Sequence, residues 1–484
     1  MSFSKYTWVA VLIAISTASC KKWLDVQPKT EMRRDELFTT QTGFQDALSG
    51  AYIKLKDADL YGYNLTIGAL EHLVSSWDVV ANSTNQRINR FIYQDAGVES
   101  AFSQIFSKQY NVIASVNAIL DQIETKKSVF STPGMYEMIK GECLALRAYV
   151  HFDLLRLYGP VPVNTTGEPI IPYVKTLSID HNPRLSFEAF KNAVMADLEE
   201  ADKLLKNIDP VLQYSLVVLL NPNGPLNDFR PDDPYKAFRQ FRMNYYAVKA
   251  LQARAWAWFG DKQKAFELAK LVVDAKNSDG TSKFALGTDA DMVKGDFVLT
   301  REHIWSLYDF ELFRKYTDYF KNPQLYKGKN DAAIKTDLYG AGSEKDIRAL
   351  KLWEPVVLNP GGNFYVTKKY SSAERYEFAS DDTKRWPMLR ISEMYLLMVE
   401  CGPAADAQAA WNAFCIARGM VAAQLPADPA AVTTLVNKEF RKEFFAEGQA
   451  FYAYKRINAP TFLWAPPGFA INYVVPVPRN EFTR

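Results

Sequence analysis

The chain has 484 residues, with 57 Lys and Arg against 55 Asp and Glu and an aromatic content of 14%. A formal net charge of +2 excludes a strongly basic surface of the nucleic-acid-binding type. No stretch after the N-terminal segment is apolar over the ~20 residues that a membrane span requires. The length allows one large domain or two to three ordinary ones, and the 26 Tyr and 10 Trp suit a protein that stacks flat ligands.

The first 20 residues predict a signal peptide of the lipoprotein type. One cation, Lys5, precedes an apolar run from Tyr6 to Ile15, which has the length of a signal-peptide core and is too short to span a bilayer. Three small residues, 17–19, stand directly before Cys20. We expect cleavage before Cys20 and acylation of this residue, so that several acyl chains anchor the mature protein to a membrane. The alternative is an ordinary exported protein that is cut nearby, in which Cys20 has no role.

The body of the chain has mainly helical periodicity. Between residues 139 and 157, apolar side chains recur at steps of three and four along two adjacent stripes, formed by Ile139, Cys143, Leu146, Val150, Leu154 and Leu157 and by Leu144, Ala148, Phe152 and Leu155. A helix that is apolar on two sides is expected between neighbouring helices, and Gly159 with Pro160 would end it. The three later cysteines lie in similar apolar contexts, and we expect buried thiols rather than disulfides.

Two segments share the spacing of a helical hairpin. In each, a glycine (Gly260 or Gly402) is followed five residues later by an alanine (Ala265 or Ala407), with large apolar residues at matching offsets. This is the pattern of a tetratricopeptide unit, in which the small residue lets the second helix pack closely on the first. The two glycines are 142 residues apart, so the fold must bring the two units together across long insertions.

The insertions at 160–184, 207–235 and 315–387 are rich in Pro, Gly, Asn, Asp and aromatic residues, which predicts functional loops. Sugar rings are recognised by aromatic platforms together with a few amide, carboxylate or guanidinium groups. The candidate ligand-binding residues of these types are Trp77, Asp78, Asn82, Arg87, Tyr316, Tyr319, Tyr326 and Trp353. For each aromatic residue the alternative is a side chain that anchors its loop in the core. This alternative is favoured for Trp305 and Tyr308, whose spacing predicts a short buried strand.

The sequence contains no recognisable catalytic or metal-binding motif. Its four histidines form neither HExxH nor a ligand cluster, and there is no Walker loop or GxSxG elbow. His151 and Asp153 are expected to be structural residues with satisfied hydrogen bonds, and NPGGNFY (359–365) to form a turn. We therefore expect neither an enzyme nor a bound metal or cofactor, although paired glycosidase carboxylates can come from distant positions.

From end to end, the chain resembles the SusD/RagB family, the surface nutrient-binding lipoproteins of Bacteroidetes. The motifs that carry the resemblance follow one another in the segments 21–52, 110–124, 140–163, 385–400, 437–456 and 473–482, and include Asn117, Glu142, Arg147, Arg441, Glu447 and Gly448. The chain departs from the family at Lys21 and Lys22, where acidic residues often follow the cysteine. It departs again at Gln449, which stands where an arginine is usual.

The resemblance implies an all-α dominated, SusD-like fold, in which tetratricopeptide-type helix pairs carry a loop-rich ligand-binding face. Residues 21–484 would form one domain, with a mostly helical scaffold at 21–275 and a loop-rich part plus C-terminal helices at 276–484. The resemblance also implies a lipid-anchored outer-membrane protein at the cell surface. Such a protein binds an oligosaccharide, less often a peptide, and delivers it to a SusC-like TonB-dependent transporter.

Two other functions are compatible with the sequence. One is a tetratricopeptide-type scaffold of the cell envelope with no small ligand, and the other is a surface glycosidase. In all three cases the charged residues of the helical motifs have a structural interpretation. Arg147 and Glu142 are expected to pair with other helices, and Glu393 or Glu447 are the candidate carboxylate partners of the Arg147 guanidinium.

Overall fold

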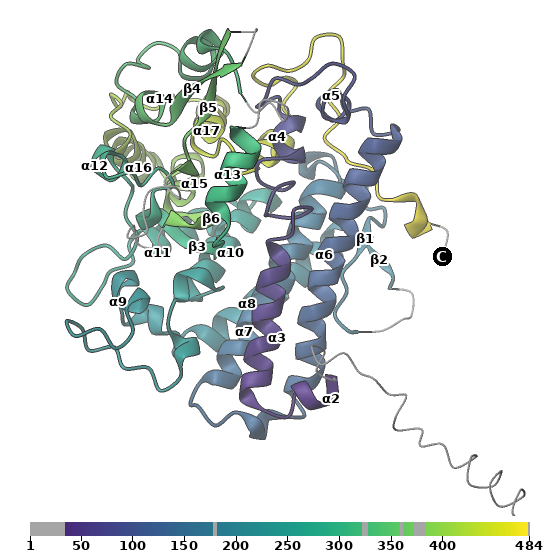
Figure 1. Ribbon diagram of the computed structural model, residues 1–484, viewed down its shortest axis with the longest axis vertical. Coiled ribbons are helices and arrows are strands. Elements are labelled where there is room, and N and C mark those ends of the chain that lie inside the picture. Colours follow the sequence, from purple (N-terminus) through teal and green to yellow (C-terminus); the bar gives the residue numbers. More distant parts are fainter. Residues whose placement is uncertain (1–33, 178–181, 322–327, 359–361, 372–382, 483–484) are drawn as a thin grey trace, which may run out of the picture.

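The computed structural model describes residues 34–177, 182–321, 328–358, 362–371 and 383–482, so that Cys20 and Tyr326 lie outside the described residues. Helices dominate the molecule (Figure 1). The longer ones are α3 (Gln41–Leu55), α6 (Ala96–Ile123), α7 (Met135–Tyr158), α8 (Phe187–Leu205), α10 (Tyr245–Phe259), α11 (Lys262–Val273), α13 (Leu312–Phe320), α15 (Ile391–Cys401), α16 (Ala404–Ala417) and α17 (Pro429–Glu443). The shorter ones include α2 (Arg34–Leu37), α4 (Ala69–Leu73), α5 (Thr84–Asn89), α9 (Leu216–Leu220), α12 (Asp289–Val293), α14 (Ile347–Lys351), α18 (Ala450–Arg456) and the π-helical turn η8 (Ala333–Tyr339).

The long helices of the first half lie side by side, and α7 is at their centre. Helix α7 packs against α6 on one side and α8 on another, with further contacts to α3 and α10. All of its residues are buried except Glu137 and Lys140. The helix ends at Gly159, whose backbone N–H bonds to Leu155 O. The two predicted apolar stripes and the predicted end of this helix are therefore confirmed, because the helix has neighbours on every side.

The two predicted helical hairpins are present and pack against each other. Gly260 ends α10 in the left-handed region, with φ 87°, and α11 then folds back on α10; Gly402 separates α15 from α16 in the same way but with an extended backbone. Helix α11 also packs against α15. The contact between these helices joins units that are far apart in the sequence, as the repeat pattern requires.

The described residues also form three two-stranded antiparallel sheets: β1 (Ile171–Pro172) with β2 (Arg184–Leu185), β3 (His303–Tyr308) with β6 (Arg385–Arg390), and β4 (Trp353–Leu358) with β5 (Gly362–Thr367). Trp305 is buried in β3, which confirms the predicted strand. Strands β4 and β5 pair in register on either side of residues 359–361. One hydrophobic core runs through the molecule from Phe38 to Val475 and contains side chains from both halves of the chain.

Arg147 pairs with a neighbouring helix, as expected, but the partner is Asp197 of α8. The Arg147 guanidinium donates from Nε and Nη2 to the Asp197 carboxylate at 2.7 and 2.8 Å, and from Nη1 to Asn117 Oδ1 at 3.0 Å. The prediction of Glu393 or Glu447 as its partner is wrong. Sequence spacing does not indicate which helix packs beside a buried arginine. Helix α8 is the neighbour of α7 that supplies the carboxylate.

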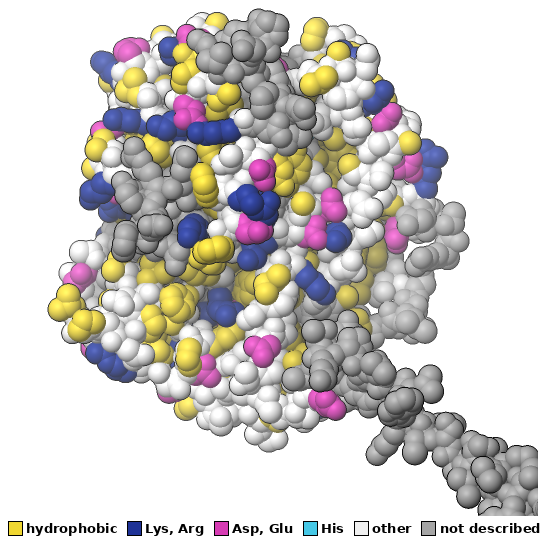
Figure 2. Space-filling model, viewed as in Figure 1, with side chains coloured by type: hydrophobic (Ala, Val, Ile, Leu, Met, Phe, Trp, Pro, Cys, Tyr) yellow, Lys and Arg dark blue, Asp and Glu magenta, His cyan; other side chains and the backbone are white. Residues whose placement is uncertain are grey.

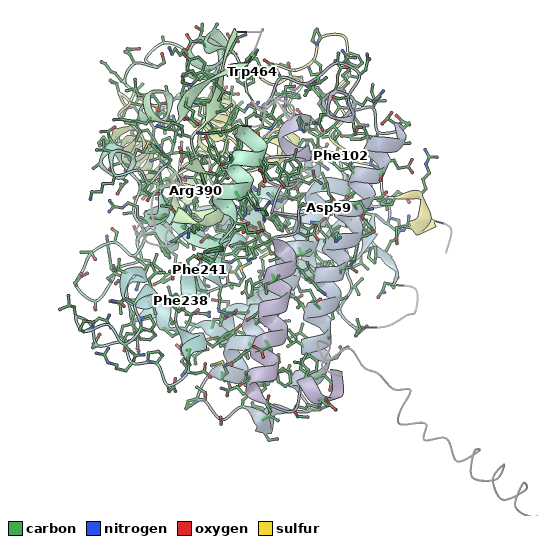
Figure 3. The ribbon with its side chains drawn as sticks, in the orientation of Figure 1. Asp59, Phe102, Phe238, Phe241, Arg390 and Trp464 are labelled. Atoms are coloured by element: carbon green, nitrogen blue, oxygen red, sulfur yellow. The ribbon has the colours of Figure 1, made fainter. Side chains whose placement is uncertain are left out.

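Glu393 and Glu447 each bind another cation. Glu393 accepts two hydrogen bonds from Arg254, at 2.7 and 2.6 Å, and Glu447 pairs with Arg390 and with Lys369. Arg390, near the centre of Figure 3, also donates to Glu302 and Glu443. Together these contacts belong to a buried charge network, formed by the cations Arg348, Lys369, Arg390 and Arg418 and the anions Glu302, Asp346, Glu439, Glu443 and Glu447.

The remaining polar and thiol groups of the helices are structural. Cys143, Cys401 and Cys415 form no disulfide, as predicted; Cys143 and Cys415 are buried, whereas Cys401 is half-buried. His151 donates from Nδ1 to Arg147 O at 2.9 Å and accepts at Nε2 from Val174 N–H at 3.0 Å, and burial lowers the pKa of His151 to about 3. Asp153 accepts hydrogen bonds from Tyr61 and Arg156. Within the described residues, no helix combines the length and the apolar character that crossing a membrane requires.

Candidate ligand-binding face

Two loops that the sequence predicts to bind ligand meet in the structure. The backbone N–H of Asp78 donates to Gly328 O at 3.0 Å, and Lys329 Nζ donates to Asp78 Oδ1 at 2.7 Å. Trp77 contacts Phe320 of α13 edge to face, with ring centroids 5.5 Å apart. Helix α13 accordingly lies beside α4 in Figure 1. We call the surface formed by residues 63–87, 316–321, 328–354 and 464 the loop face.

Trp77 and Tyr316 lie beneath this face rather than on it. Each is only 1% exposed. The indole Nε1–H of Trp77 donates to Ile67 O at 3.0 Å, and its ring packs edge to face on Phe445. The Tyr316 hydroxyl donates to Glu354 Oε1 at 2.7 Å. For these two residues the structure agrees with the alternative interpretation, an aromatic side chain that anchors its loop in the core.

Tyr319 and Trp353 are half-buried and keep part of their rings at the surface. The ring of Tyr319 lies 4.5 Å from that of Tyr63, centroid to centroid, with the two planes tilted by 39°. Burial, together with the nearby Tyr319, raises the pKa of Tyr63 to about 12, so its hydroxyl remains a hydrogen-bond donor at neutral pH. Trp353 donates from Nε1 to the hydroxyl of Tyr339 at 3.3 Å.

The polar candidates are spread over a wider area. Asp78 has a side chain that is 39% exposed and paired with Lys329. Asn82 is exposed and has a positive φ of 60° in the turn that precedes α5. Arg87 forms an ion pair with Asp95 at 3.1 Å and donates to Asn82 O. Asp78 therefore belongs to the junction of the two loops, whereas Arg87 holds its own loop in shape.

Trp464 is a surface aromatic residue that the sequence analysis missed. It is half-buried and adopts φ 64°, which is rare for a bulky side chain and marks local strain. Lys329 Nζ lies 4.7 Å and Arg441 Cζ 5.3 Å from its ring centroid, and its Nε1–H donates to Asp337 at 3.2 Å. Figure 3 places it in the upper part of the molecule. The signal that could have found it is a tryptophan between Pro460 and Pro466 in a turn-rich segment.

The charges of this region are paired and mixed in sign. Burial lowers the pKa of Lys329, which is 7% exposed, although its partner Asp78 opposes this effect. Lys and Arg are interspersed with Asp and Glu over the viewed face in Figure 2, with hydrophobic side chains between them. Among the described residues, no group of three or more His, Cys, Asp or Glu side chains is placed to hold a metal ion. Half-exposed rings beside paired charges are suited to binding a ligand with apolar faces and hydroxyl edges.

The fold and this face define a class: a helical-repeat protein with a loop-built face that carries half-buried aromatic rings. A family model described as "Starch-binding associating with outer membrane" matches residues 22–214. SusD-like protein P38 of Formosa agariphila is 26% identical over 217 residues, which are 44% of this chain and 40% of that protein. SusD-like protein P25 of the same organism is 23% identical over 210 residues, or 42% of this chain and 38% of that protein. The chain thus spans about 40% of the length of the curated relatives that it matches.

Solved structures extend the similarity of the fold over most of the chain. A SusD-like carbohydrate-binding protein from Bacteroides vulgatus superposes with a TM-score of 0.63 at 18% identity, covering 86% of this chain and 83% of that one. A SusD superfamily protein from Bacteroides thetaiotaomicron gives the same score and identity over 92% and 98%. These superpositions confirm the predicted all-α, SusD-like fold.

Proposed function

We propose that this protein binds an oligosaccharide on its loop face and delivers it to a SusC-like TonB-dependent transporter of the outer membrane. The observation that carries this proposal is the junction of the two loops through Asp78 and Lys329, beside the half-buried rings of Tyr319 and Trp464. Aromatic faces pack on the C–H faces of sugars, while the charged groups bind hydroxyls. The description of the matching family, which names starch binding and the outer membrane, supports the same conclusion.

The proposal includes a lipid anchor on Cys20 and display at the cell surface. It assigns no catalytic step to the chain. Anchoring would keep the protein and its transporter in the same membrane, which raises the effective concentration of each protein near the other. A low direct affinity between the two proteins would then be sufficient for transfer of the ligand.

A binding screen of the chain from Lys21 onward tests the ligand. Neutral plant and bacterial oligosaccharides, acidic oligosaccharides and peptides would be titrated by calorimetry and tryptophan fluorescence. Saturable binding of an oligosaccharide without product formation supports the proposal. Binding of peptides alone, or release of a shorter sugar, contradicts it.

A second experiment tests the partner and the scaffold alternative. The full-length chain with a C-terminal tag, and its Cys20→Ala variant, would be purified from outer membranes of a Bacteroidetes host. We expect a SusC-like transporter to co-purify with the full-length chain, and the variant to be lost from the membrane fraction. Recovery of other envelope proteins, with no glycan bound in the screen, would favour the envelope scaffold.

A further inference from the structure

A cavity of about 620 Å³ opens next to Trp464, between α17, η8 and the segment 454–463, which comprises the end of α18 and the turn after it. This volume lies within the range of ~300–1,000 Å³ that is typical of small-molecule sites. None of the predicted ligand-binding residues lines it. Its link to the loop face is Asp337, which lines the cavity and accepts the indole N–H of Trp464 at 3.2 Å.

The wall of the cavity combines apolar side chains with hydrogen-bonding groups. Tyr339, Tyr454, Phe462 and Leu463 provide aromatic and aliphatic surface. Helix α17 presents polar residues at steps of three and four along one face, namely Thr434, Asn437, Lys438, Arg441 and Lys442. Such a wall can contact the apolar face and the hydroxyl edge of the same small ring.

Two buried polar atoms of this wall have no hydrogen-bond partner among the described residues: Asn437 Oδ1 and Arg441 Nε. Asn437 is 4% exposed and Arg441 is 1% exposed. Arg441 uses its two Nη groups elsewhere, donating to Ser76 Oγ and to Val74 O at 2.7 Å each. Buried polar groups are nearly always paired, so these two atoms distinguish the wall of the cavity from an ordinary buried surface.

The charges at the cavity balance. Lys442 is held by Glu439 at 2.8 Å, and Arg441 faces Glu71 at 3.7 Å. Of the remaining lining residues, Lys438 is exposed and has no ion pair within the described part of the chain, and the exposed Asp337 carries the opposite charge. A carboxylate or sulfate on the ligand would gain from Lys438 but would be repelled by Asp337. A neutral molecule with several hydroxyls would use both.

We infer that this cavity binds one uncharged sugar unit at the end or branch of the captured oligosaccharide, with the next unit lying against Trp464. The inference rests on the proposed function and adds the class of the terminal sugar and its place in the fold. The hydroxyls of this unit would bind the exposed Asp337 and Lys438. Its apolar face would lie on the wall formed by the aromatic residues.

The test begins with the neutral oligosaccharide that binds most tightly among malto-, xylo-, manno- and β-gluco-hexaoses, with oligogalacturonate as the acidic probe. Thr461→Trp places a large side chain at an exposed lining position and fills the cavity. Lys438→Ala removes an exposed side chain, so we expect it to leave the free energy of unfolding nearly unchanged. Thr125→Trp, at an exposed position outside the cavity, is the matched control.

We expect Thr461→Trp to raise Kd for the neutral probe at least about tenfold and Lys438→Ala about threefold, each being a typical loss for a blocked or weakened subsite. Thr125→Trp should leave Kd unchanged. Unchanged Kd in both cavity variants overturns the inference while the proposed function stands. Tighter binding of oligogalacturonate than of any neutral probe overturns the uncharged assignment. Failure of every oligosaccharide to bind the wild type instead refutes the proposed function and, with it, this inference.

A crystal structure with the same probe gives an independent readout. Density for a terminal sugar beside Asp337 and Asn437 supports the inference. Density for the sugar on the loop face alone, with only water in the cavity, overturns it.

Discussion

Asp78 and Lys329 are 251 positions apart in the sequence, and their side chains form a 2.7 Å ion pair that joins the two loops of the loop face. Lys329 also lies over the ring of Trp464, at 4.7 Å from its centroid. The buried ammonium group of Lys329 therefore positions a carboxylate and an aromatic ring, so that three distant segments meet at one point. A long-range contact of this kind fixes the shape of the face before ligand arrives, which lowers the entropic cost of binding.

Replacement of this lysine should weaken ligand binding more than it weakens the fold. In Lys329→Met, Asp78 stays partly exposed and water can solvate it, but the loops and Trp464 lose their common partner. We expect Kd for the best oligosaccharide to rise about tenfold, a typical effect for a central interface residue. Lys270→Met is the control, because Lys270 pairs with Asp274 at the same 2.7 Å on the exposed side of α11. Equal affinities of the two variants would contradict this role.

Trp464 and Trp77 should respond to substitution in opposite ways. Trp464→Gly removes a half-buried ring and relieves a left-handed backbone that glycine adopts freely. We expect at least an approximately tenfold loss of glycan affinity, with a free energy of unfolding within about 1 kcal/mol of the wild type.

Trp77→Ala, in contrast, deletes a fully buried side chain with a satisfied indole N–H. We expect its free energy of unfolding to fall by about 3–5 kcal/mol. Denaturant titration of both variants, followed by calorimetry at a temperature where both are folded, separates the two effects. A Trp77→Ala protein of normal stability that binds no glycan would instead identify Trp77 as a contact residue.

These two tryptophans show where sequence reasoning succeeds and where it stops. Periodicity and the glycine spacing predict α7 and both helical hairpins, because these patterns report local burial. They cannot assign partners across the fold, which is why Arg147 was paired with the wrong carboxylates. Trp77 lies in one of the two loops that were predicted to bind ligand, but composition does not distinguish a ring on the surface from one beneath it. Trp464 carries no periodic signal and is recognised only through its contacts with Lys329 and Asp337.

Glu443 is the central anion of the buried charge network, and its removal should be costly. It accepts hydrogen bonds from Arg348, Arg390 and Arg418, and the nearby guanidinium groups hold its pKa well below the usual range even though burial opposes this. In Glu443→Gln these cations lose their shared partner, and we expect a loss of about 3–5 kcal/mol in the free energy of unfolding.

The pH dependence of this effect has a definite sign. Because the pKa of Glu443 is lower in the folded than in the unfolded state, its contribution is complete above pH 4.5 and is lost as the pH falls toward the folded value. The difference in stability between wild type and Glu443→Gln should therefore narrow between pH 5 and pH 3. Glu311→Gln, which removes an exposed ion pair with Arg314, should change stability by no more than about 1 kcal/mol at any pH. A constant difference across this range would exclude the ionised state of Glu443 as the cause.

Gly402 lets the two helical hairpins approach each other. A Cβ at this position would lie 2.6 Å from Met398 O and 2.8 Å from the ring of Phe266 in α11. We expect Gly402→Ala to lower the free energy of unfolding by about 1–3 kcal/mol, as for other overpacked sites. Gly50 lies within α3, and a Cβ at this position would meet no atom within 4 Å. Gly50→Ala should therefore raise the free energy of unfolding by about 0.5–1 kcal/mol, because alanine favours the helix. Urea titrations would measure both, and the same sign for both substitutions would contradict the steric role of Gly402.

Lys283 should destabilise the protein at neutral pH and cease to do so in mild base. It is 5% exposed and donates to Tyr214 O at 3.0 Å, and burial lowers its pKa from 10.5 to about 8. Between pH 8 and pH 10.5 the unfolded chain therefore holds a proton that the folded chain has released, so this group adds stability as the pH rises.

Lys283→Met replaces the ammonium group with an apolar chain of similar length. At pH 7 we expect the variant to be more stable than wild type by about 1 kcal/mol or more, since each unit of pKa difference is worth about 1.4 kcal/mol. The advantage should shrink above pH 8, because the neutral amine of the wild type then costs little to bury. Urea titrations of the wild type and the variant at pH 7 and pH 9.5 measure this difference in stability. Groups that titrate equally in both proteins do not contribute to the difference. An advantage that is equal at both pH values would show that the ammonium group is not the source of the cost.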